Sequence, residues 1–357
     1  MNAKLEQLSK HLVGTHNAAL VTADHHLCYL TGFPSGESYI FITPEKSYFL
    51  TDFRYIEMAK NTVSGAECVM INRLTDTLNT LCEKHNIQSI LLESSETSLA
   101  FSNRLADGLK KVTLITDDTL DNRLTEMRAV KDENEIRRIE AAQAITEAGF
   151  HHILPYIREG VTEKEIALEL EFFMRREGAQ RVAFDFIVVS GANSSLPHGI
   201  PSNKPIEKGD FITMDFGAVV DGYHSDMTRT VALGSVSDEQ REIYNTVLAA
   251  QTASLSVLKA GITCADGDAA ARNVIVNAGY GNCFGHGTGH GVGVQIHEAP
   301  TVSPRGGSTL LKVGNVVTVE PGIYLEGKFG VRIEDMALIT EDGCRNLTHC
   351  PKELILL

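Results

Sequence analysis

The amino-acid sequence predicts two domains, a mixed α/β domain at the amino end and a larger α+β domain after it. The length of 357 residues is enough for about two domains of ~150 residues each. Short β-branched and aromatic runs alternate with amphipathic stretches in the first third of the chain, whereas helix-capping signals and a β-hairpin signal mark the rest. We therefore expect a first domain over 1–122, a junction over 123–135 and a second domain over 136–357.

In the first domain, short runs rich in β-branched and aromatic residues predict strands. These runs are Ala18–Val21, Tyr39–Ile42, Tyr48–Leu50, Cys68–Ile71, Ile90–Leu92 and Val112–Ile115. Amphipathic stretches between them, for example Thr75–His85 and Leu99–Leu109, predict helices. This alternation is typical of a layered domain with helices over a mixed sheet.

The second domain begins with helical signals. Residue pairs with the spacing of a capping box predict helix starts at Asp132, Thr162, Ser237 and Thr263. The apolar period changes to two over 211–218, and further strands are predicted at Val316–Val319 and Val331–Ile339. Helices beside antiparallel hairpins are typical of an α+β domain.

Composition and charge indicate a globular protein and argue against nucleic-acid binding. Hydrophobic residues make up 43% of the chain and charged residues 22%, which is ordinary for a globular protein. The 46 acidic residues outnumber the 32 basic ones, which gives a net charge of -14. A protein that coats nucleic acid needs a basic face, so we expect no nucleic-acid partner.

The sequence predicts a cytoplasmic protein with no membrane segment. The opening residues, MNAKLEQLSKHLVGT, lack the apolar core of a secretory signal, and no apolar run approaches 18 residues. The 7 cysteines are scattered and include no CxxC pair, which argues against a zinc finger and a disulfide framework. Reduced thiols in a cytoplasm are the simplest account.

Asp215 and Asp226 are predicted to lie on one face of a β-hairpin. The dipeptide Asp221-Gly222 between them is a strong two-residue turn signal, which fixes the register of the flanking strands. Because side chains alternate with period two, the two carboxylates become diagonal neighbours ~7 Å apart. Such a pair repels unless it binds protons or cations. The alternative is two solvated surface carboxylates.

The segment GHGTGHGVGVQIHEAP has glycine at every second position from Gly285 to Gly293. So many glycines exclude a helix, and in an extended segment they indicate a face that lies against another backbone or a ligand. His286 and His290 share the opposite face, and His297 follows. A lone histidine is more often a core residue, but two on one face favour a functional site.

Two later strands add carboxylates. Glu320 ends an apolar strand just before a Pro-Gly break, and GVRIEDMALIT is predicted to place Arg332 and Glu334 on one face of a single strand. One glutamate at the end of an apolar strand is unremarkable by itself. Several carboxylates with a histidine indicate an oxygen-rich site for Mn²⁺, Co²⁺ or Zn²⁺. Four carboxylates would neutralise two divalent cations, and two-metal sites activate water and polarise a substrate oxygen.

These residues and their contexts resemble the pita-bread metallopeptidases. The segments MDFGA, SDMTRT, HGTGHGVG, VEPGIY and GVRIED occur in the order of that family. The spacing resembles the Xaa-Pro branch, which contains aminopeptidase P and prolidase, and YLTGF and TDFRYIEMA are similar to its creatinase-type N-terminal domain. The resemblance implies a pita-bread (creatinase/aminopeptidase-like) catalytic domain preceded by a smaller α/β creatinase-type domain.

The resemblance also implies a role for each site residue. The metal ligands would be Asp215, Asp226, His290, Glu320 and Glu334. Glu320 would handle the proton of the water that bridges the two metal ions, first as general base and then as general acid. His198 would contact the reacting carbonyl, and His297 would lie near the scissile peptide. His286 would line the proline pocket. Arg332 would support the ligands and contact the substrate, or only balance the charge beside Glu334. Two metal ions, Mn²⁺ before Co²⁺ or Zn²⁺, and a homodimer are implied as well.

The implied activity is hydrolysis of the bond between an N-terminal residue and a following proline. We expect an Xaa-Pro aminopeptidase that takes peptides with proline in the second position. The alternative is an Xaa-Pro dipeptidase, or prolidase, restricted to dipeptides. A non-catalytic pita-bread binding module, or a creatinase-like hydrolase that needs no metal, would be expected to lack the intact carboxylate set.

Overall fold

The computed structural model describes residues 2–33 and 36–357, and the chain divides into two compact units, Met1–Arg128 and Ala129–Leu357. The domain bounds expected from the sequence, 1–122 and 136–357, stay a prediction. Within the described ranges, no helix has the length and apolar character needed to cross a membrane.

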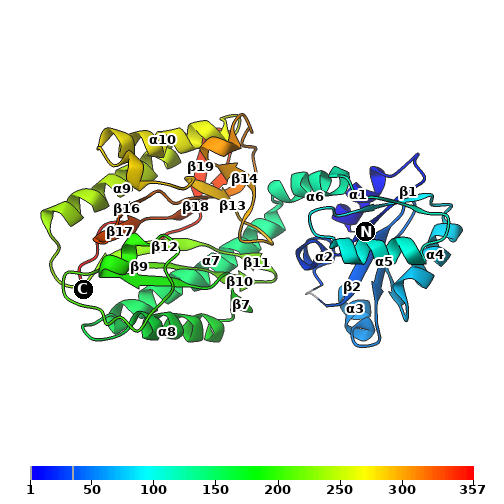
Figure 1. Ribbon diagram of the computed structural model, residues 1–357, viewed down its shortest axis with the longest axis horizontal. Helices are drawn as coiled ribbons and strands as arrows, with labels where there is room; N and C mark the ends of the chain where they lie inside the picture. The colour runs from blue at the N-terminus through cyan, green and yellow to red at the C-terminus, as the bar shows by residue number, and fades with distance from the viewer. Residues whose placement is uncertain (1, 34–35) are drawn as a thin grey trace. The chain divides into compact units, whose positions relative to one another are not determined.

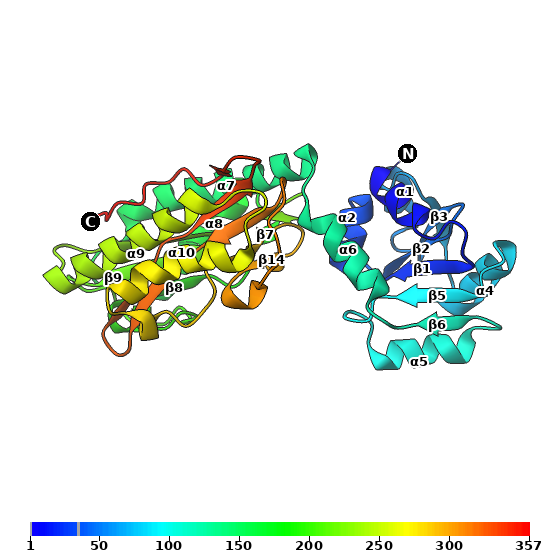
Figure 2. The same cartoon turned by 90° about the horizontal axis from the view of Figure 1, so that it is seen from above.

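The first unit is built on a mixed sheet with the strand order β4-β3-β2-β1-β5-β6, part of which Figure 2 shows edge to edge. The strands are β1 (Asn17–Val21), β2 (Ser38–Ile42), β3 (Ser47–Thr51), β4 (Glu67–Met70), β5 (Ser89–Leu92) and β6 (Thr113–Ile115). The helices are α1 (Ala3–Lys10), α2 (Asp24–Thr31), α3 (Ile56–Thr62), α4 (Leu74–Lys84), α5 (Leu99–Gly108) and α6 (Thr119–Ala129). Leu78 of α4 and Leu105 of α5 pack on Leu20 and Leu50 of the sheet. The predicted strands and both predicted helices are present.

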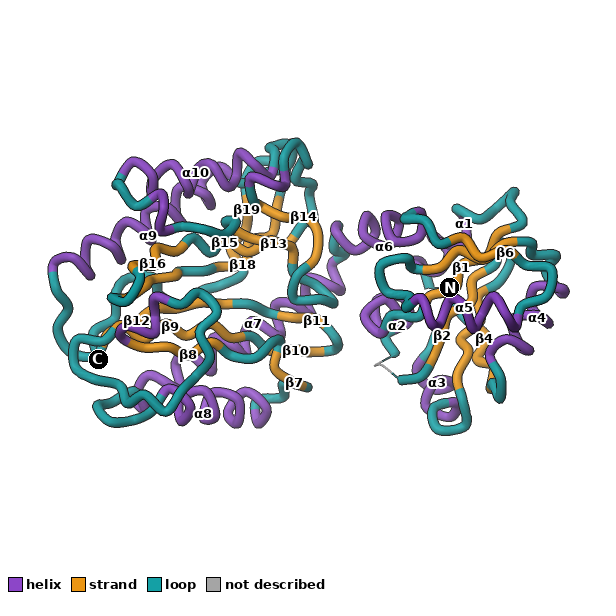
Figure 3. Tube along the Cα trace, in the orientation of Figure 1, coloured by secondary structure: helices purple, strands orange, loops and turns teal. Residues whose placement is uncertain are grey.

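The second unit places its strands between two pairs of helices, as Figures 1 and 3 show. Its helices are α7 (Glu133–Ile153), η1 (Leu154–Tyr156), α8 (Glu163–Arg176), η2 (Gly191–Ser195), α9 (Asp238–Val257), α10 (Cys264–Asn277), η3 (Gly281–Cys283) and η4 (Pro304–Gly306). The first strands are β7 (Arg181–Val182), β8 (Ile187–Ser190), β9 (Phe211–Phe216), β10 (Ala218–Val220), β11 (Tyr223–His224) and β12 (Met227–Ala232). The later strands are β13 (Gly289–Gly291), β14 (Glu298–Val302), β15 (Val316–Val319), β16 (Gly322–Leu325), β17 (Phe329–Arg332), β18 (Asp335–Ile339) and β19 (Cys344–Asn346).

The two faces of β9 belong to different environments. Ile212, Met214 and Phe216 join the core against α7 and α8, as the period of two predicts. Phe211 joins the second core, against α9 and α10, and Asp215 points to the same side as Phe211 because side chains alternate along a strand. One strand therefore anchors the first helix pair and still offers a carboxylate on its other face.

Capping signals placed the helix starts correctly. Asp132, Thr162 and Ser237 each cap a helix in a full capping box. Thr263 also caps its helix, but the Asp266 carboxylate bonds the Thr263 hydroxyl at 2.7 Å rather than a backbone N–H. The shorter aspartate side chain explains this difference.

One sequence expectation is wrong. The segment GVRIEDMALIT does not form a single strand but divides into β17 and β18, which belong to different sheets. The break falls at Ile333 and Glu334, because the backbone N–H of Glu334 donates to the carbonyl of Thr228 at 3.1 Å. This break brings Glu334 against the β9–β12 hairpin.

Candidate metal centre

The hairpin that carries the two aspartates forms as the turn sequence requires. Val220 pairs with Tyr223 across the turn, and Asp221 and Gly222 both have positive φ angles, 48° and 79°. In the outer part of the hairpin, Asp215 lies opposite Thr228. Asp226 is 4% exposed and lines the same cavity as Asp215.

The alternating glycines let the histidine segment lie against other backbones. A Cβ on Gly289 would collide with the carbonyl oxygen of Thr318, and a Cβ on Gly291 would collide with that of Ala299. Strand β13 is therefore held between β14 and β15. His290 lies between these two glycines, and its backbone N–H donates to the Thr318 hydroxyl at 3.0 Å. The predicted close approach is confirmed.

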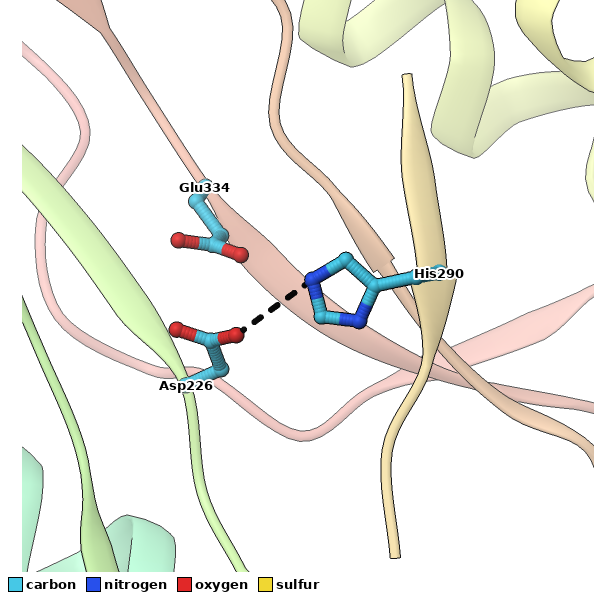
Figure 4. A group of neighbouring side chains, drawn as sticks. All are labelled: Asp226, His290 and Glu334. Carbon is cyan, nitrogen blue, oxygen red and sulfur yellow. Dashed lines mark ion pairs between the residues drawn. The ribbon is translucent and has the colours of Figure 1, made fainter. Parts of the chain in front are cut away.

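Three of the predicted ligands converge from different elements, and Figure 4 shows their side chains pointing toward one another. Ligand atoms of Asp226, His290 and Glu334 all lie within 4.8 Å of one another. The His290 Nε2 atom is 3.6 Å from Asp226 Oδ2 and 3.3 Å from Glu320 Oε1. Four predicted ligands therefore surround one small volume.

The carboxylates of Asp226 and Glu334 share a buried site that disfavours their charges. Burial and the neighbouring Glu334 raise the pKa of Asp226 well above its usual value. Burial, Glu320 and Asp215 raise the pKa of Glu334 in the same way, although Thr228 donates a hydrogen bond to it at 2.7 Å. Both carboxylates need a proton or a cation to be stable at this position.

The pKa of Glu320 is shifted in the opposite direction to those of Asp226 and Glu334. Burial would raise its pKa, but the hydrogen bond and the charge of His290 lower the pKa of Glu320 to about 2. Burial acts against the charged form of His290, yet Glu320 raises the pKa of this histidine. The two side chains form an ion pair that a metal ion would replace by binding both.

Asp215 is held by Arg332. The Arg332 guanidinium donates to Asp215 Oδ2 at 2.6 Å, to the Thr228 hydroxyl at 3.0 Å and to the Tyr324 hydroxyl at 2.9 Å. Asp215 Oδ1 is buried and has no hydrogen-bond partner among the described residues. An unpartnered carboxylate oxygen in a carboxylate and imidazole cluster fits a hard divalent cation.

The remaining predicted residues line one cavity of about 1430 Å³ together with the carboxylates. His198 and His297 are exposed on its wall, and the His297 ring lies 4.3 Å from the His290 ring. His286 is half-buried, and its Nε2 atom lies 2.9 Å from the Tyr324 hydroxyl. Burial lowers the pKa values of His286 and His297, which favours the neutral form of both rings. All nine predicted site residues therefore line this cavity.

Several cavity residues or their supports were missed from the sequence. Thr228 follows Asp226 by two positions, so the strand period alone places it on the same face. Tyr324 is part of the segment VEPGIY, but nothing local indicates that its hydroxyl bonds His286 and Arg332. Arg305 lies in the Ser-Pro-Arg-Gly-Gly turn and is exposed on the cavity wall. A cation in a turn after a glycine-rich segment is too common a feature to single out.

Comparison with known proteins identifies both parts of the chain. Residues 137–341 match the model of metallopeptidase family M24, and residues 9–130 match the creatinase/prolidase N-terminal domain. A protein of Pyrococcus horikoshii named Xaa-Pro dipeptidase is 38% identical, over 99% of each chain.

Two solved structures share the whole fold. The Xaa-Pro dipeptidase from Bacillus anthracis has a TM-score of 0.94 and 40% identity, and it covers 100% of both chains. The X-Pro aminopeptidase from Thermotoga maritima has a TM-score of 0.91 and 40% identity, with 100% of this chain and 99% of that chain covered. The predicted creatinase-type domain followed by a pita-bread catalytic domain is confirmed, and this chain belongs to metallopeptidase family M24.

Proposed function

We propose that this chain is an Xaa-Pro dipeptidase, which hydrolyses the bond between an N-terminal residue and a C-terminal proline. Full-length similarity to proteins named Xaa-Pro dipeptidase supports it over the aminopeptidase that the sequence alone favoured. The cavity supports it too, because the exposed Arg305 lies on its wall. A dipeptide ends in a free carboxylate directly after the proline, and this cation can pair with it.

The carboxylate and histidine cluster is proposed to hold two divalent metal ions. The five ligands would be Asp215, Asp226, His290, Glu320 and Glu334. The unpartnered Asp215 Oδ1 and the raised pKa values of Asp226 and Glu334 support this assignment. Mn²⁺ is the proposed ion, with Co²⁺ and Zn²⁺ as alternatives, because oxygen donors with one imidazole suit all three. When bound, such ions activate water and stabilise negative charge on a carbonyl oxygen.

The chain's own residues move the proton and orient the substrate. The Glu320 carboxylate lies 3.3 Å from His290 at the edge of the cluster, where it can accept the proton of the attacking water and later deliver it to the proline nitrogen. His198 and His297 lie on the cavity wall with exposed rings that can bond the scissile carbonyl. Arg332 holds Asp215 in place and reaches the cavity itself.

The bond before proline explains why general peptidases fail on this substrate. Proline has no backbone N–H, and its ring fixes φ, so a site that recognises an extended peptide by backbone hydrogen bonds cannot hold it. Here recognition is proposed to fall on the end of the substrate, where Arg305 would bind the free carboxylate.

Substrate length is the direct test. We expect kcat/KM of the Mn²⁺-loaded protein to be higher for Ala-Pro than for Ala-Pro-Ala or for the Ala-Pro amide. Arg305→Ala should raise KM for Ala-Pro at least ~10-fold, because a charged hydrogen bond is lost. It should leave the Ala-Pro amide unaffected, since that substrate has no carboxylate to bind. Arg305→Lys is the matched control and should retain most of the preference.

The competing activity is that of an Xaa-Pro aminopeptidase. It is favoured by the X-Pro aminopeptidase from Thermotoga maritima, which is 40% identical, and by a cavity of about 1430 Å³ that is larger than a dipeptide needs. A higher kcat/KM for Ala-Pro-Ala than for Ala-Pro would establish this alternative and reject the dipeptidase. The homodimer and the cytoplasmic location stay predictions.

A further inference from the structure

Two residues of α10 bind the loop that leads into β13. The Arg272 guanidinium donates to the carbonyl of Phe284 at 3.1 Å and to the carbonyl of His286 at 2.7 Å. It also lies 4.3 Å from the centre of the Phe284 ring, which packs edge-on against the His286 ring with 5.0 Å between centroids. Arg272 therefore fixes both the backbone of this loop and a ring that contacts His286.

Asp268, one turn earlier on α10, completes the same arrangement. Its carboxylate accepts two bonds from Arg272, at 2.7 and 2.9 Å. It also accepts from the Thr288 backbone N–H at 3.0 Å and from the Thr288 hydroxyl at 2.9 Å. The Thr288 carbonyl in turn accepts from the backbone N–H of Glu320 at 2.7 Å. One carboxylate, 2% exposed, thus connects α10 to the two segments that carry His290 and Glu320.

The loop needs such support because its own sequence gives it little. Residues 284–288 form neither helix nor strand, and Gly285 and Gly287 offer no side chains to pack. A glycine-rich backbone populates many conformations unless outside contacts restrict it. The hydrogen bonds from Arg272 and to Asp268 restrict it, together with the buried Phe284 ring and the bond between His286 and Tyr324.

From this loop the contacts continue to the candidate metal centre. The His286 ring meets the Tyr324 hydroxyl, which accepts from Arg332, and Arg332 donates to Asp215. Arg272 therefore differs from Arg305, although both line the cavity. The Arg272 guanidinium is occupied by protein acceptors, so it orients other groups, whereas Arg305 is exposed on the cavity wall.

We propose that Asp268 and Arg272 form a positioning pair that holds His286 in the orientation that binds the proline end of the substrate. This inference rests on the proposed function, in which His286 lines the proline site. The pair acts through the backbone of residues 284–288, and neither member touches the reacting atoms. Its loss should weaken substrate binding more than turnover.

The test compares Arg272→Met with Arg175→Met in the Mn²⁺-loaded protein. Arg175 forms the same acid–arginine pair, with Glu171 one turn earlier on α8 at 2.9 Å, outside the cavity lining. Arg272→Met should raise KM for Ala-Pro and the inhibition constant of free proline at least ~10-fold, with kcat and Mn²⁺ content within about threefold of wild type. Arg272→Lys should recover part of the loss, and Arg175→Met should change neither constant.

Hydrogen exchange gives a second readout that does not depend on activity. Amides within 284–288 should exchange faster in Arg272→Met than in wild type. Their exchange rates in Arg175→Met should equal those of wild type. An unchanged KM for Ala-Pro in Arg272→Met would overturn the positioning pair, whether or not hydrogen exchange, Mn²⁺ content or thermal stability changes. If wild type failed to cleave Ala-Pro while the loop still loosened in Arg272→Met, the dipeptidase function would fail and the role of the pair in loop order would stand.

Discussion

Two neighbouring residues, Glu334 and Asp335, carry buried carboxylates in opposite electrostatic states. Asp335 is 0% exposed and accepts hydrogen bonds from four side chains at 2.8–2.9 Å, those of Arg229, Gln251, Asn346 and Lys352. Burial acts against its charge, but Arg229 and Lys352 lower the pKa of Asp335. The chain therefore compensates this charge by itself.

Glu334 is compensated only in part, because the Thr228 hydrogen bond and the charge of Arg332 act to lower its pKa but are outweighed. It is 1% exposed, and its pKa is raised by burial and by the charges of Glu320 and Asp215. Thr228 donates one hydrogen bond to it, and Arg332 is directed to Asp215 instead. A buried carboxylate that is compensated by cationic side chains stabilises the structure. A buried carboxylate beside like charges is stabilised when it binds a cation. In the sequence Glu-Asp, the first carboxylate thus faces the candidate metal centre and the second is compensated in the core.

Removing the uncompensated charge should have the largest effect on activity. Glu334→Gln is expected to lower kcat/KM for Ala-Pro at least ~1000-fold with loss of bound Mn²⁺, because a metal ligand matters more than the supporting groups around it. The metal-free variant should be at least as stable as the metal-free wild type, since a buried like-charge contact is gone. Metal analysis and thermal unfolding in EDTA measure both effects. A variant that kept its Mn²⁺ and its activity would remove Glu334 from the ligand set.

Removing the compensated charge should act on stability instead. Asp335→Asn is expected to destabilise the protein by about 3 kcal/mol, because the buried Arg229 loses its carboxylate partner and keeps only carbonyl acceptors. The loss should be the same with Mn²⁺ and with EDTA, as measured by urea unfolding. A loss that disappears in EDTA would mean that Asp335 acts through the metal centre, and the contrast between the two neighbours would not hold.

The hairpin shows what local sequence can predict about this contrast. The turn Asp221-Gly222 fixes the register of β9 and β12, so the shared face of Asp215 and Asp226 follows from period two alone. Asp335 stands in the same quoted segment as Glu334, but its four partners come from other segments of the chain. The local sequence pattern therefore predicts where the carboxylates lie. Only the tertiary contacts show which carboxylate has its negative charge compensated by other side chains.

The first unit shows the same limit for helices. Helix α2 begins after Ala23, which has no capping side chain. The acceptor at this helix start is Glu93, whose carboxylate receives the backbone N–H groups of Thr22 and Ala23 at 2.5 and 3.1 Å from about 70 residues away. The helices at Asp132, Thr162 and Ser237 carry their caps within three residues, which is why their starts can be predicted.

The two kinds of carboxylate should also respond differently to pH. Asp226 and Glu334 have raised pKa values in the metal-free fold, so they stabilise it below the unfolded pKa of ~4 and this contribution is lost as the pH rises through the raised values. Metal ions compete with those protons. The stabilisation by Mn²⁺ should therefore grow between pH 5 and pH 8, by about 1.4 kcal/mol per pH unit for each proton displaced.

Thermal unfolding with Mn²⁺ and with EDTA between pH 5 and pH 8 measures the stabilisation by Mn²⁺ at each pH. Glu334→Gln should flatten the pH dependence of the stabilisation by Mn²⁺. Asp335→Asn should leave this pH dependence as in wild type. A gain independent of pH in the wild type would mean that the cluster is already deprotonated without metal, and that the carboxylates are compensated within the chain after all.

A helix cap that contacts neither Glu334 nor Asp335 gives a reference value for these stability losses. Ser237 accepts the Gln240 backbone N–H at 3.2 Å, and the Gln240 side chain accepts the Ser237 backbone N–H at 2.8 Å. Ser237→Ala should cost about 1 kcal/mol, as loss of a helix cap does. Urea unfolding should give the same cost with Mn²⁺ and with EDTA, because no charge of either network is changed. If the cost of Ser237→Ala differed between Mn²⁺ and EDTA, the start of α9 would be coupled to the candidate metal centre. A metal-dependent loss of stability would then no longer distinguish a proposed ligand such as Glu334 from a structural carboxylate such as Asp335.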